Sequence, residues 1–294
     1  MTTSKDTKND RGIALISVLW ALMILSILAL SVMTVVRVQS HYASNIGQKL
    51  KAEAVADAGI YLAIQKLSAP GAVRKLPGKI SSLNLTFAGK DIKVTIIPED
   101  GKIDLNMSHE VLIAAALAYN GMDENEATTI AEDIRNIRRN SSEKAFKIIS
   151  DIRQFKGISG QLYSCIAPYL TVYSNRVGVN YSAASDDMKA MIKWADKVRW
   201  GGQNWLEISG GQVSSLVSGT RSVLQQTGSH AGKAFTIRAE IALNDEVKVQ
   251  RTAIIRITGN RREPFWVYKW ESKYQNADIK CKRIDEKRLG FVGY

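Results

Sequence analysis

A long uncharged apolar segment lies near the N-terminus of the chain. Residues 13–36 read IALISVLWALMILSILALSVMTVV and make up 24 positions without a charged side chain. An α-helix needs about 20 predominantly apolar residues to cross the hydrocarbon core of a bilayer. The segment therefore predicts a transmembrane helix, preceded by a polar leader, residues 1–12, that contains Lys5, Lys8 and Arg11.

A cleaved secretory signal peptide is an alternative for this segment. Such a peptide has an apolar region of about 7–15 residues followed by a site of small residues. The segment here is longer, and Ala29-Leu30-Ser31 matches such a site only weakly. We therefore favour an apolar helix that stays in the protein, either as a plain anchor or after a cut in front of it.

The helical pattern continues beyond the apolar segment. Residues recur there at spacings of three and four, which is the pattern of one face of an α-helix. This stripe consists of Ile46, Leu50, Ala54, Ala58 and Tyr61, and the small residues Ala52, Ala56 and Gly59 favour close packing beside it. No proline occurs before Pro70. We predict one helix from about Ile13 to about Leu67, whose second half lies on a soluble domain.

Alternating apolar and polar residues predict strands in two later regions. The first hairpin contains Leu83, Leu85 and Phe87, a turn at 88–90, and then Ile92, Val94 and Ile96. The second contains alternating residues of 235–243, a turn at Asn244-Asp245, and residues 247–255. An aromatic edge strand follows at 265–270, and we expect its aromatic side chains to pack in the core.

The region between the hairpins has the pattern of helices. Ser108 is the expected cap of a first helix that runs to Asn120 and stops at Gly121. Four further helices are predicted at 124–139, 143–155, 159–166 and 185–198. The predicted fold class is α+β, with a pilin-like long N-terminal helix packed on an antiparallel sheet and a large α-helical insertion.

Six segments follow from these patterns. They are a leader (1–12), the transmembrane half of the long helix (13–36), the rest of that helix with the first strands (37–100), the α-helical insertion (101–218), the remaining strands (219–271) and a polar tail (272–294).

Composition and charge add little about function. The net charge is +12, from 40 basic and 28 acidic residues, and it is not concentrated in one run. The two cysteines, Cys165 and Cys281, have no histidine at the spacing of a zinc ligand. Disulfides form in oxidising compartments, but the sequence leaves open whether these two cysteines meet.

No catalytic constellation occurs in the sequence. It contains no G-x-S-x-G, H-E-x-x-H or Walker A pattern. His41, His109 and His230 are isolated, which favours surface positions over catalysis. The sequence therefore predicts a protein that is not an enzyme, with no catalytic, cofactor-binding or metal-binding residues.

Two segments suggest helix-hairpin-helix units. One is 146–170 with Ile158-Ser159-Gly160, and the other is 205–216 with Gly210-Gly211. Such hairpins can hold a nucleic-acid phosphate with backbone amides, and a basic face is predicted nearby at Arg135, Arg138 and Arg139. The same unit also occurs as a simple packing element, and we expect no nucleic acid.

The junction Arg11-Gly12-Ile13-Ala14-Leu15 resembles that of the type IV pilin and pseudopilin superfamily. The resemblance implies a cut by a prepilin peptidase between Gly12 and Ile13 and methylation of the new N-terminus at Ile13. Most members carry a glutamate at the fifth mature position, which here is Ser17. An intramembrane charge is costly unless it is paired, and in the family that glutamate pairs with the terminal amine of a neighbouring subunit.

The absence of this glutamate resembles one branch of the superfamily, the minor pseudopilins called protein K of the type II secretion system. Further segments resemble this branch in its order along the chain: GKIDLN at 101–106, PYLTVYS at 168–174, Val179-Asn180, and Tyr268 with Trp270. Members sit at the tip of the pseudopilus, where no subunit lies above them to receive the glutamate.

This resemblance implies the location and the partners of the chain. We expect a single-pass protein of the bacterial inner membrane with its C-terminal domain in the periplasm. The implied partners are other minor pseudopilins in a tip complex, the major pseudopilin and the prepilin peptidase. Members often bind calcium at an acidic cluster, but the corresponding run 134–140 has lost most of its acids, so we expect no cofactor there.

Three alternatives stay open at this point. The first is a minor pilin of a type IV pilus, which acts in adhesion or DNA uptake. The second is a membrane-tethered DNA-binding module, and the third is a membrane-tethered enzyme. The missing glutamate and the helical insertion favour the secretion pseudopilin.

Overall fold

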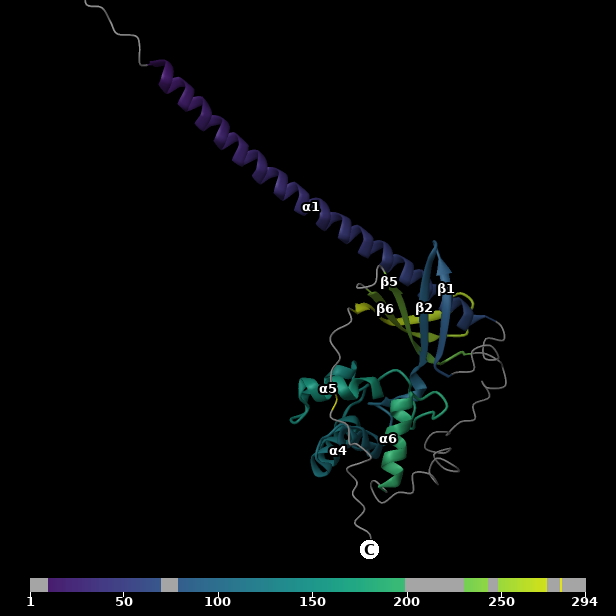
Figure 1. Cartoon of the computed structure of the whole chain (residues 1–294). Helices are drawn as coiled ribbons and strands as arrows, with labels where there is room; N and C mark the ends of the chain where they lie inside the picture. The colour runs from purple at the N-terminus through teal and green to yellow at the C-terminus, as the bar shows by residue number, and fades with distance from the viewer. Residues whose placement is uncertain (1–9, 70–78, 199–229, 243–247, 274–280, 282–294) are drawn as a thin grey trace, which may run out of the picture. The chain divides into compact units, whose positions relative to one another are not determined.

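The structure of the chain is a computed structural model that describes residues 10–69, 79–198, 230–242, 248–273 and 281 (Figure 1). Its internal contacts divide the chain into two units, residues 1–52 and residues 53–294. The second unit holds the C-terminal part of the long helix, a sheet and a group of shorter helices.

The long helix α1 runs from Asp10 to Ser68, which confirms the helix predicted over residues 13–67. The segment 15–68 is long and apolar enough to cross a membrane. The hydroxyls of Ser26 and Ser31 each donate to a carbonyl oxygen one turn earlier, at 2.8 and 2.9 Å. Because lipid offers no hydrogen-bond partners, this internal bonding lets the helix carry hydroxyls in an apolar environment.

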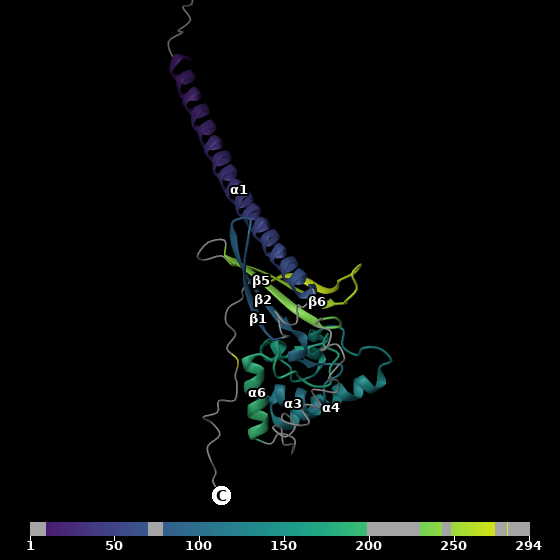
Figure 2. The same ribbon diagram turned by 90° about the vertical axis from the view of Figure 1, so that its right-hand side faces the viewer.

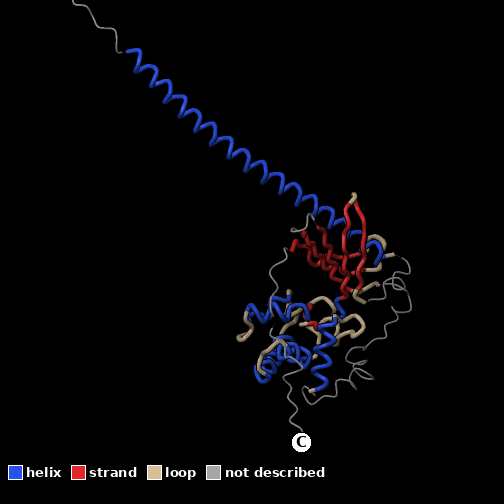
Figure 3. The backbone as a smooth tube through the Cα atoms, in the orientation of Figure 1, coloured by secondary structure: helices blue, strands red, loops and turns tan. Residues whose placement is uncertain are grey.

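One antiparallel sheet of five strands forms the centre of the second unit (Figure 3). Its spatial order is β1-β2-β5-β6-β7. The strands are β1 (Ser81–Phe87), β2 (Lys90–Pro98), β5 (Ala234–Ala242), β6 (Lys248–Ile257) and β7 (Phe265–Lys273). Both predicted hairpins and the aromatic edge strand are confirmed; the predicted turn at 244–245 lies outside the described residues.

A tight turn sets the register of the first hairpin. Ala88 and Gly89 both have positive φ, 49° and 71°, as the two central residues of a type I′ turn require. Phe87 therefore lies opposite Lys90, and Leu83 and Leu85 lie opposite the apolar residues of β2.

The end of α1 packs on one face of this sheet. The residues it buries there are at most 3% exposed and recur at helical spacing: Ala56, Ile60, Ala63, Ile64 and Leu67. Gly59 allows the helix to approach β2 closely, because a Cβ atom at that position would lie 2.9 Å from Cγ2 of Ile92. The fold is thus α+β and pilin-like, with the helix on the antiparallel sheet as predicted.

The stripe that faces the sheet differs from the predicted one. Leu50 and Tyr61 are 59% and 56% exposed, and Ala54 is exposed as well. The buried face instead combines small residues, Ala56, Gly59 and Ala63, with the large Ile60, Ile64 and Leu67. Apolar residues recur at helical spacing on more than one face of the helix, and the periodicity alone does not tell which face meets the sheet.

A polar network joins α1 to β6 and β7. The carboxylate of Asp57 accepts from the guanidinium of Arg251 at 2.7 and 3.0 Å, and from the indole N–H of Trp270 at 2.8 Å. Arg251 also donates to the hydroxyl of Ser272 at 2.5 Å, and that hydroxyl donates to Glu53 at 3.1 Å. The bidentate arrangement fixes the rotation of the helix on the sheet.

The helical insertion lies between β2 and β5 in the sequence. It contains η1 (Glu99–Gly101), β3 (Ile103–Asp104), α3 (Glu110–Tyr119), α4 (Glu124–Asn140), η2 (Ile149–Gln154), α5 (Gly160–Ile166), η3 (Ala167–Tyr169), β4 (Leu170–Thr171) and α6 (Asp186–Lys197). Its helices gather beyond one end of the sheet in both views (Figure 1 and Figure 2). Asp123, Ser159 and Ser185 cap α4, α5 and α6 with side-chain oxygens.

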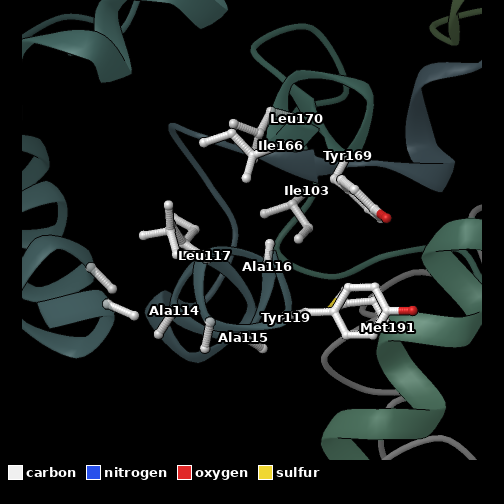
Figure 4. Close-up of a cluster of buried hydrophobic side chains, with 14 of the residues drawn as sticks. Ile103, Ala114, Ala115, Ala116, Leu117, Tyr119, Ile166, Tyr169, Leu170 and Met191 are labelled. Carbon is white, nitrogen blue, oxygen red and sulfur yellow. The ribbon is translucent and has the colours of Figure 1, made fainter. Parts of the chain in front are cut away.

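The insertion has a core of its own. Figure 4 shows Ile103, Ile166 and Leu170 gathered over Ala116 and Leu117 of α3. All five are at most 2% exposed. Small alanines along α3 let the short strands and α5 come close, so the core forms from segments distant in sequence.

Two local predictions for the insertion are wrong. The predicted helix 143–155 is a loop followed by the 3-10 helix η2, because the side chain of Asn106 binds both backbone groups of Phe146 at 2.9 Å. Ser108 does not cap α3; His109 does, and its Nδ1 accepts from the N–H of Val111 at 3.4 Å. The hydroxyl of Ser108 instead accepts from the N–H of Asp104.

Two predictions about exposure are also wrong. In β7, Trp266 and Tyr268 are 55% and 40% exposed rather than packed in the core. His230, expected at the surface, is buried, and its ring meets that of Phe235 edge-on at 5.2 Å. Sequence patterns do not tell which face of the edge strand β7 is covered, nor that the loop residue His230 packs against Phe235 of β5.

We expect Asp57→Ala to lower the free energy of unfolding by about 1–3 kcal/mol, the range for charged hydrogen bonds at a partly covered site. Denaturant unfolding of the detergent-solubilised full chain measures this, and a double-mutant cycle with Arg251→Met isolates the coupling. The control is Glu271→Gln, which breaks the more exposed pair with Lys269 (2.8 Å) and should cost less than about 0.5 kcal/mol. Equal losses in both variants would contradict the anchoring role.

Candidate functional site

The residues of the predicted processing site lie in α1. Gly12 and Ile13 fall within the helix, in a part whose side chains lie outside the described residues. Ser17 follows one turn later with an exposed side chain. Cleavage after Gly12, methylation of Ile13 and the role of Ser17 therefore stay predictions.

The apolar part of α1 is not covered by the rest of the described chain. Its large apolar side chains from Leu15 to Val36 are each between 54% and 66% exposed. Contiguous apolar surface of this kind marks contact with a membrane or with another protein. The helix is therefore built to be surrounded by lipid or by other helices.

Two of the segments that carry the family resemblance lie side by side in the insertion. GKIDLN (101–106) provides β3 and PYLTVYS (168–174) provides β4, and the two strands form a parallel pair. The buried carboxylate of Asp104 accepts from the N–H of Asn175 at 2.8 Å and from the hydroxyl of Ser174 at 3.0 Å. These bonds satisfy a carboxylate whose burial would otherwise be costly.

Glu99 links the insertion to the sheet. Its carboxylate is 1% exposed and accepts from the hydroxyl of Thr171 in β4 and from that of Thr236 in β5, each at 2.5 Å. The ammonium of Lys102 lies 2.6 Å away and balances the charge. Because the buried carboxylate of Glu99 bonds both to the insertion and to the sheet, it holds these two parts in one arrangement.

The Val179-Asn180 segment closes the same region. The N–H of Asn180 donates to the carbonyl of Asp100 at 2.7 Å, and its amide donates to the carboxylate at 3.2 Å. Gly101 is required beside them, since a Cβ atom there would lie 2.3 Å from the carbonyl oxygen of Ala183. The three segments with family resemblance thus meet in one buried junction.

Arg138 turns inward from α4 to this junction. Its guanidinium donates to the carbonyl oxygens of Leu105 and Ser108, at 2.6 and 2.5 Å. Burial lowers the pKa of Arg138, while the charges of Asp104 and Glu110 oppose that shift. An arginine stays charged in proteins, so the junction contains a permanent internal cation.

A second arginine ties β6 to the insertion. Arg256 donates to the hydroxyl of Tyr268 and to the carbonyl oxygens of Gly232 and Tyr173, each at 2.6 Å. The rings of Tyr173 and Tyr268 stack with their centres 4.8 Å apart. Burial raises the pKa of Tyr173, and the charge of Glu99 adds to that shift. The sequence offered no signal for Arg256, because its partners lie on distant segments.

Cys165 and Cys281 form a disulfide, with their Cα atoms 5.6 Å apart. Cys165 belongs to α5 of the insertion, whereas Cys281 follows β7. The bond closes a loop across 116 residues. The bond therefore links Cys281, which follows the sheet, to the insertion. The sequence alone left open whether these two cysteines meet.

The run 134–140 does not fit a calcium ion. Ile134 is buried and Arg138 places a guanidinium where carbonyl oxygens converge. No group of three or more His, Cys, Asp or Glu side chains suited to a metal occurs among the described residues. Calcium needs several oxygen ligands with carboxylates among them, and we derive no role for it.

The basis for nucleic-acid binding is weaker than the sequence suggested. The predicted basic face is not formed, because Arg138 points inward and Arg135 pairs with Glu110 at 3.1 Å. The first helix-hairpin-helix candidate, 146–170, contains a turn at Gly157, with φ of 97°, between η2 and α5. The second, at 205–216, lies outside the described residues.

These features define a class of protein. It has a membrane-length helix whose C-terminal part packs on an antiparallel sheet, and a helical insertion whose buried polar junction is bonded to that sheet. This is a pilin-like α+β fold with an inserted helical region.

The comparisons with known proteins include a similarity to a solved structure. The chain is similar to a chain in the crystal structure of the GspK-GspI-GspJ complex from the type 2 secretion system of enterotoxigenic Escherichia coli, with 15% identity and a TM-score of 0.46. The similarity covers 81% of this chain and 99% of that chain. No protein-family model and no curated protein matches the chain. We base the function on the residues of this chain itself.

We expect Arg138→Gln to lower the melting temperature by about 5 °C or more, because it leaves two buried carbonyls without a charged donor. Calcium or a chelator should shift the melting temperature of either protein by less than about 1 °C, since only a ligand that binds the native state raises it. Arg139→Gln, at an exposed neighbouring position, is the control. A rise of several degrees with calcium would show a bound ion and contradict this interpretation of Arg138.

Proposed function

We propose that the chain is a minor pseudopilin that caps the tip of a type II secretion pseudopilus and starts its assembly, for the export of folded proteins across the outer membrane. The observation that carries this proposal is the path of α1. An uncharged apolar span continues in the same helix into residues that pack on an antiparallel sheet. The superfamily that the leader resembles has this build.

The buried junction supports the protein K branch in particular. The segments 101–106 and 168–174 are far apart in sequence, yet they pair as β3 and β4, and Ser174 donates to Asp104. Asn180 of the third segment bonds to Asp100, directly before the first one. A chance resemblance at three separate segments would have no reason to converge. Their meeting gives the resemblance a physical cause, namely a shared way of attaching the insertion.

The exposed stripe of α1 supports side-by-side assembly. Leu50, Ala54 and Tyr61 are exposed on the helix although they recur at helical spacing. Such a stripe is suited to packing against the helices of neighbouring subunits. The insertion makes the head bulky, and Ser17 replaces the glutamate that would engage a subunit above. Both features suit a subunit at the tip.

The disulfide supports a periplasmic head. Disulfides persist in the bacterial periplasm and are rare in the cytoplasm. With α1 in the inner membrane and Cys165 bonded to Cys281, the C-terminal domain would face the oxidising side. The chain would act by assembly and not as an enzyme, and a cytoplasmic ATPase would supply the work.

The nearest alternative is a minor pilin of a type IV pilus. It shares the leader and the helix on a sheet, so those features do not separate the two functions. Ser17 and the helical insertion favour the secretion pseudopilin. The DNA-binding alternative loses support with the inward position of Arg138.

We expect the full-length chain to co-purify from membranes with the minor pseudopilins encoded in its own secretion system. Leu50→Glu should weaken this complex about tenfold or more, because it places a charge in an apolar helix contact. Gln48→Glu adds the same charge at another exposed position and should leave the complex intact. Co-purification with type IV pilus subunits alone would instead establish the alternative.

A further inference from the structure

Strand β7 forms one edge of the sheet, and its first half exposes apolar and aromatic side chains beside a register shift against β6 between Ile254 and Ile255. Among the described residues it pairs only with β6. An edge strand presents unpaired backbone groups, and proteins usually protect it with charges, prolines or a cover. In β7, the consecutive residues Trp266, Val267 and Tyr268 are 55%, 48% and 40% exposed.

These side chains are exposed on both faces of the sheet. Val267 lies opposite Ile255, on the face that carries α1. Tyr61 of α1 is exposed on that side and packs against Trp270, with ring centres 5.2 Å apart and the rings tilted by 38°. Trp266 lies opposite Arg256, on the other face. A strand added beside β7 would cover both rows, since its own side chains alternate between the faces.

The edge is held in a fixed conformation. Tyr268 receives a hydrogen bond from Arg256 at 2.6 Å and stacks on Tyr173. Trp270 donates to Asp57 at 2.8 Å. A partner would therefore meet a preorganised strand and lose little free energy in ordering it.

The charges around β7 favour an acidic partner. Arg261 and Arg262 are exposed just before the strand, and Arg153 is exposed in η2 beside Tyr163, 5.6 Å from its ring centre. Burial raises the pKa of Tyr163; the charges of Lys269 and Arg153 oppose that shift, and those of Glu271 and Asp151 add to it. Of the acids near the strand, Glu271 is paired with Lys269 at 2.8 Å, and Glu263 accepts from the indole N–H of Trp266 at 3.5 Å.

We propose that β7 is the docking edge for one extended strand from the sheet of a neighbouring pseudopilin, apolar at its centre and acidic at its flank. The strand would add to the sheet through main-chain hydrogen bonds, a known mode of recognition. The inference rests on the proposed function, because a neighbour with the same build also has a sheet that follows its membrane helix.

A second copy of this chain fits the edge less well. Like charges across such an interface are unfavourable. The net charge of +12 opposes self-association in the same way.

A photocrosslinking experiment on the full chain, co-expressed in membranes with the pseudopilins of its own system, tests the proposal. Trp266→p-benzoylphenylalanine should form an adduct with one minor pseudopilin, and mass spectrometry should map it to an edge strand. Phe87→p-benzoylphenylalanine, at an exposed position of β1 on the opposite edge, is the matched control and should not form that adduct.

A charge variant gives the second readout. Val267→Lys should reduce the co-purified partner about tenfold, because a lysine on an edge strand blocks strand addition; Phe87→Lys should not. If Val267→Lys leaves the complex unchanged and position 266 gives no adduct, the docking edge is refuted while the pseudopilin function stands. An adduct with a second copy or with a protein of another class also refutes the proposed occupant. If the unaltered chain binds no pseudopilin, the proposed function itself fails.

Discussion

An apolar helix whose large side chains are more than half exposed must be removed from water, and the function of this chain depends on that constraint. Burying each such side chain is worth about 1.5–3 kcal/mol, and α1 carries many of them between Leu15 and Val36. The described chain offers them no cover. Lipid and the helices of neighbouring subunits are the two environments that do, and a filament subunit rooted in a membrane uses both.

The same helix then changes its role without a break. Over its last turns one face packs on the sheet, where Ala56, Gly59 and Ala63 allow close approach and Ile60, Ile64 and Leu67 fill the core. Asp57 fixes its rotation through Arg251 and Trp270. The insertion is attached to the sheet by the buried carboxylate of Glu99, which bonds to Thr171 and Thr236, and Arg138 ties α4 to residues 105–108 within the insertion. Polar contacts of this kind specify one arrangement more sharply than apolar contacts alone.

Much of the fold could be predicted from the sequence, because periodicity and turn chemistry are local. The long helix, both hairpins and helix α4 come from such signals. The predicted helix at 143–155 failed because Asn106, some 40 positions away, binds the backbone of Phe146. The predicted stripe on α1 was wrong because residues 46–67 carry apolar residues on more than one face, and only the folded sheet decides which face is buried.

In the buried junction, too, local features could be predicted and tertiary contacts could not. The segments that resemble the family could be found in the sequence, but their meeting at Asp104 and Asn180 could not, since it depends on tertiary structure. The disulfide between Cys165 and Cys281 depended on it as well. Arg256 and the exposed edge of β7 had no local signal, because exposure is a property of the folded sheet.

The most direct test of the central claim is the N-terminal mass of the protein purified from its native membrane. If the chain is a pseudopilin, it begins at Ile13 with a methylated amine, because a prepilin peptidase has removed the leader after Gly12. A chain that begins at Met1 or Thr2 would be an ordinary membrane anchor. A chain that begins after Ser31 would be a secreted protein, and either result would contradict the assignment to a pseudopilus.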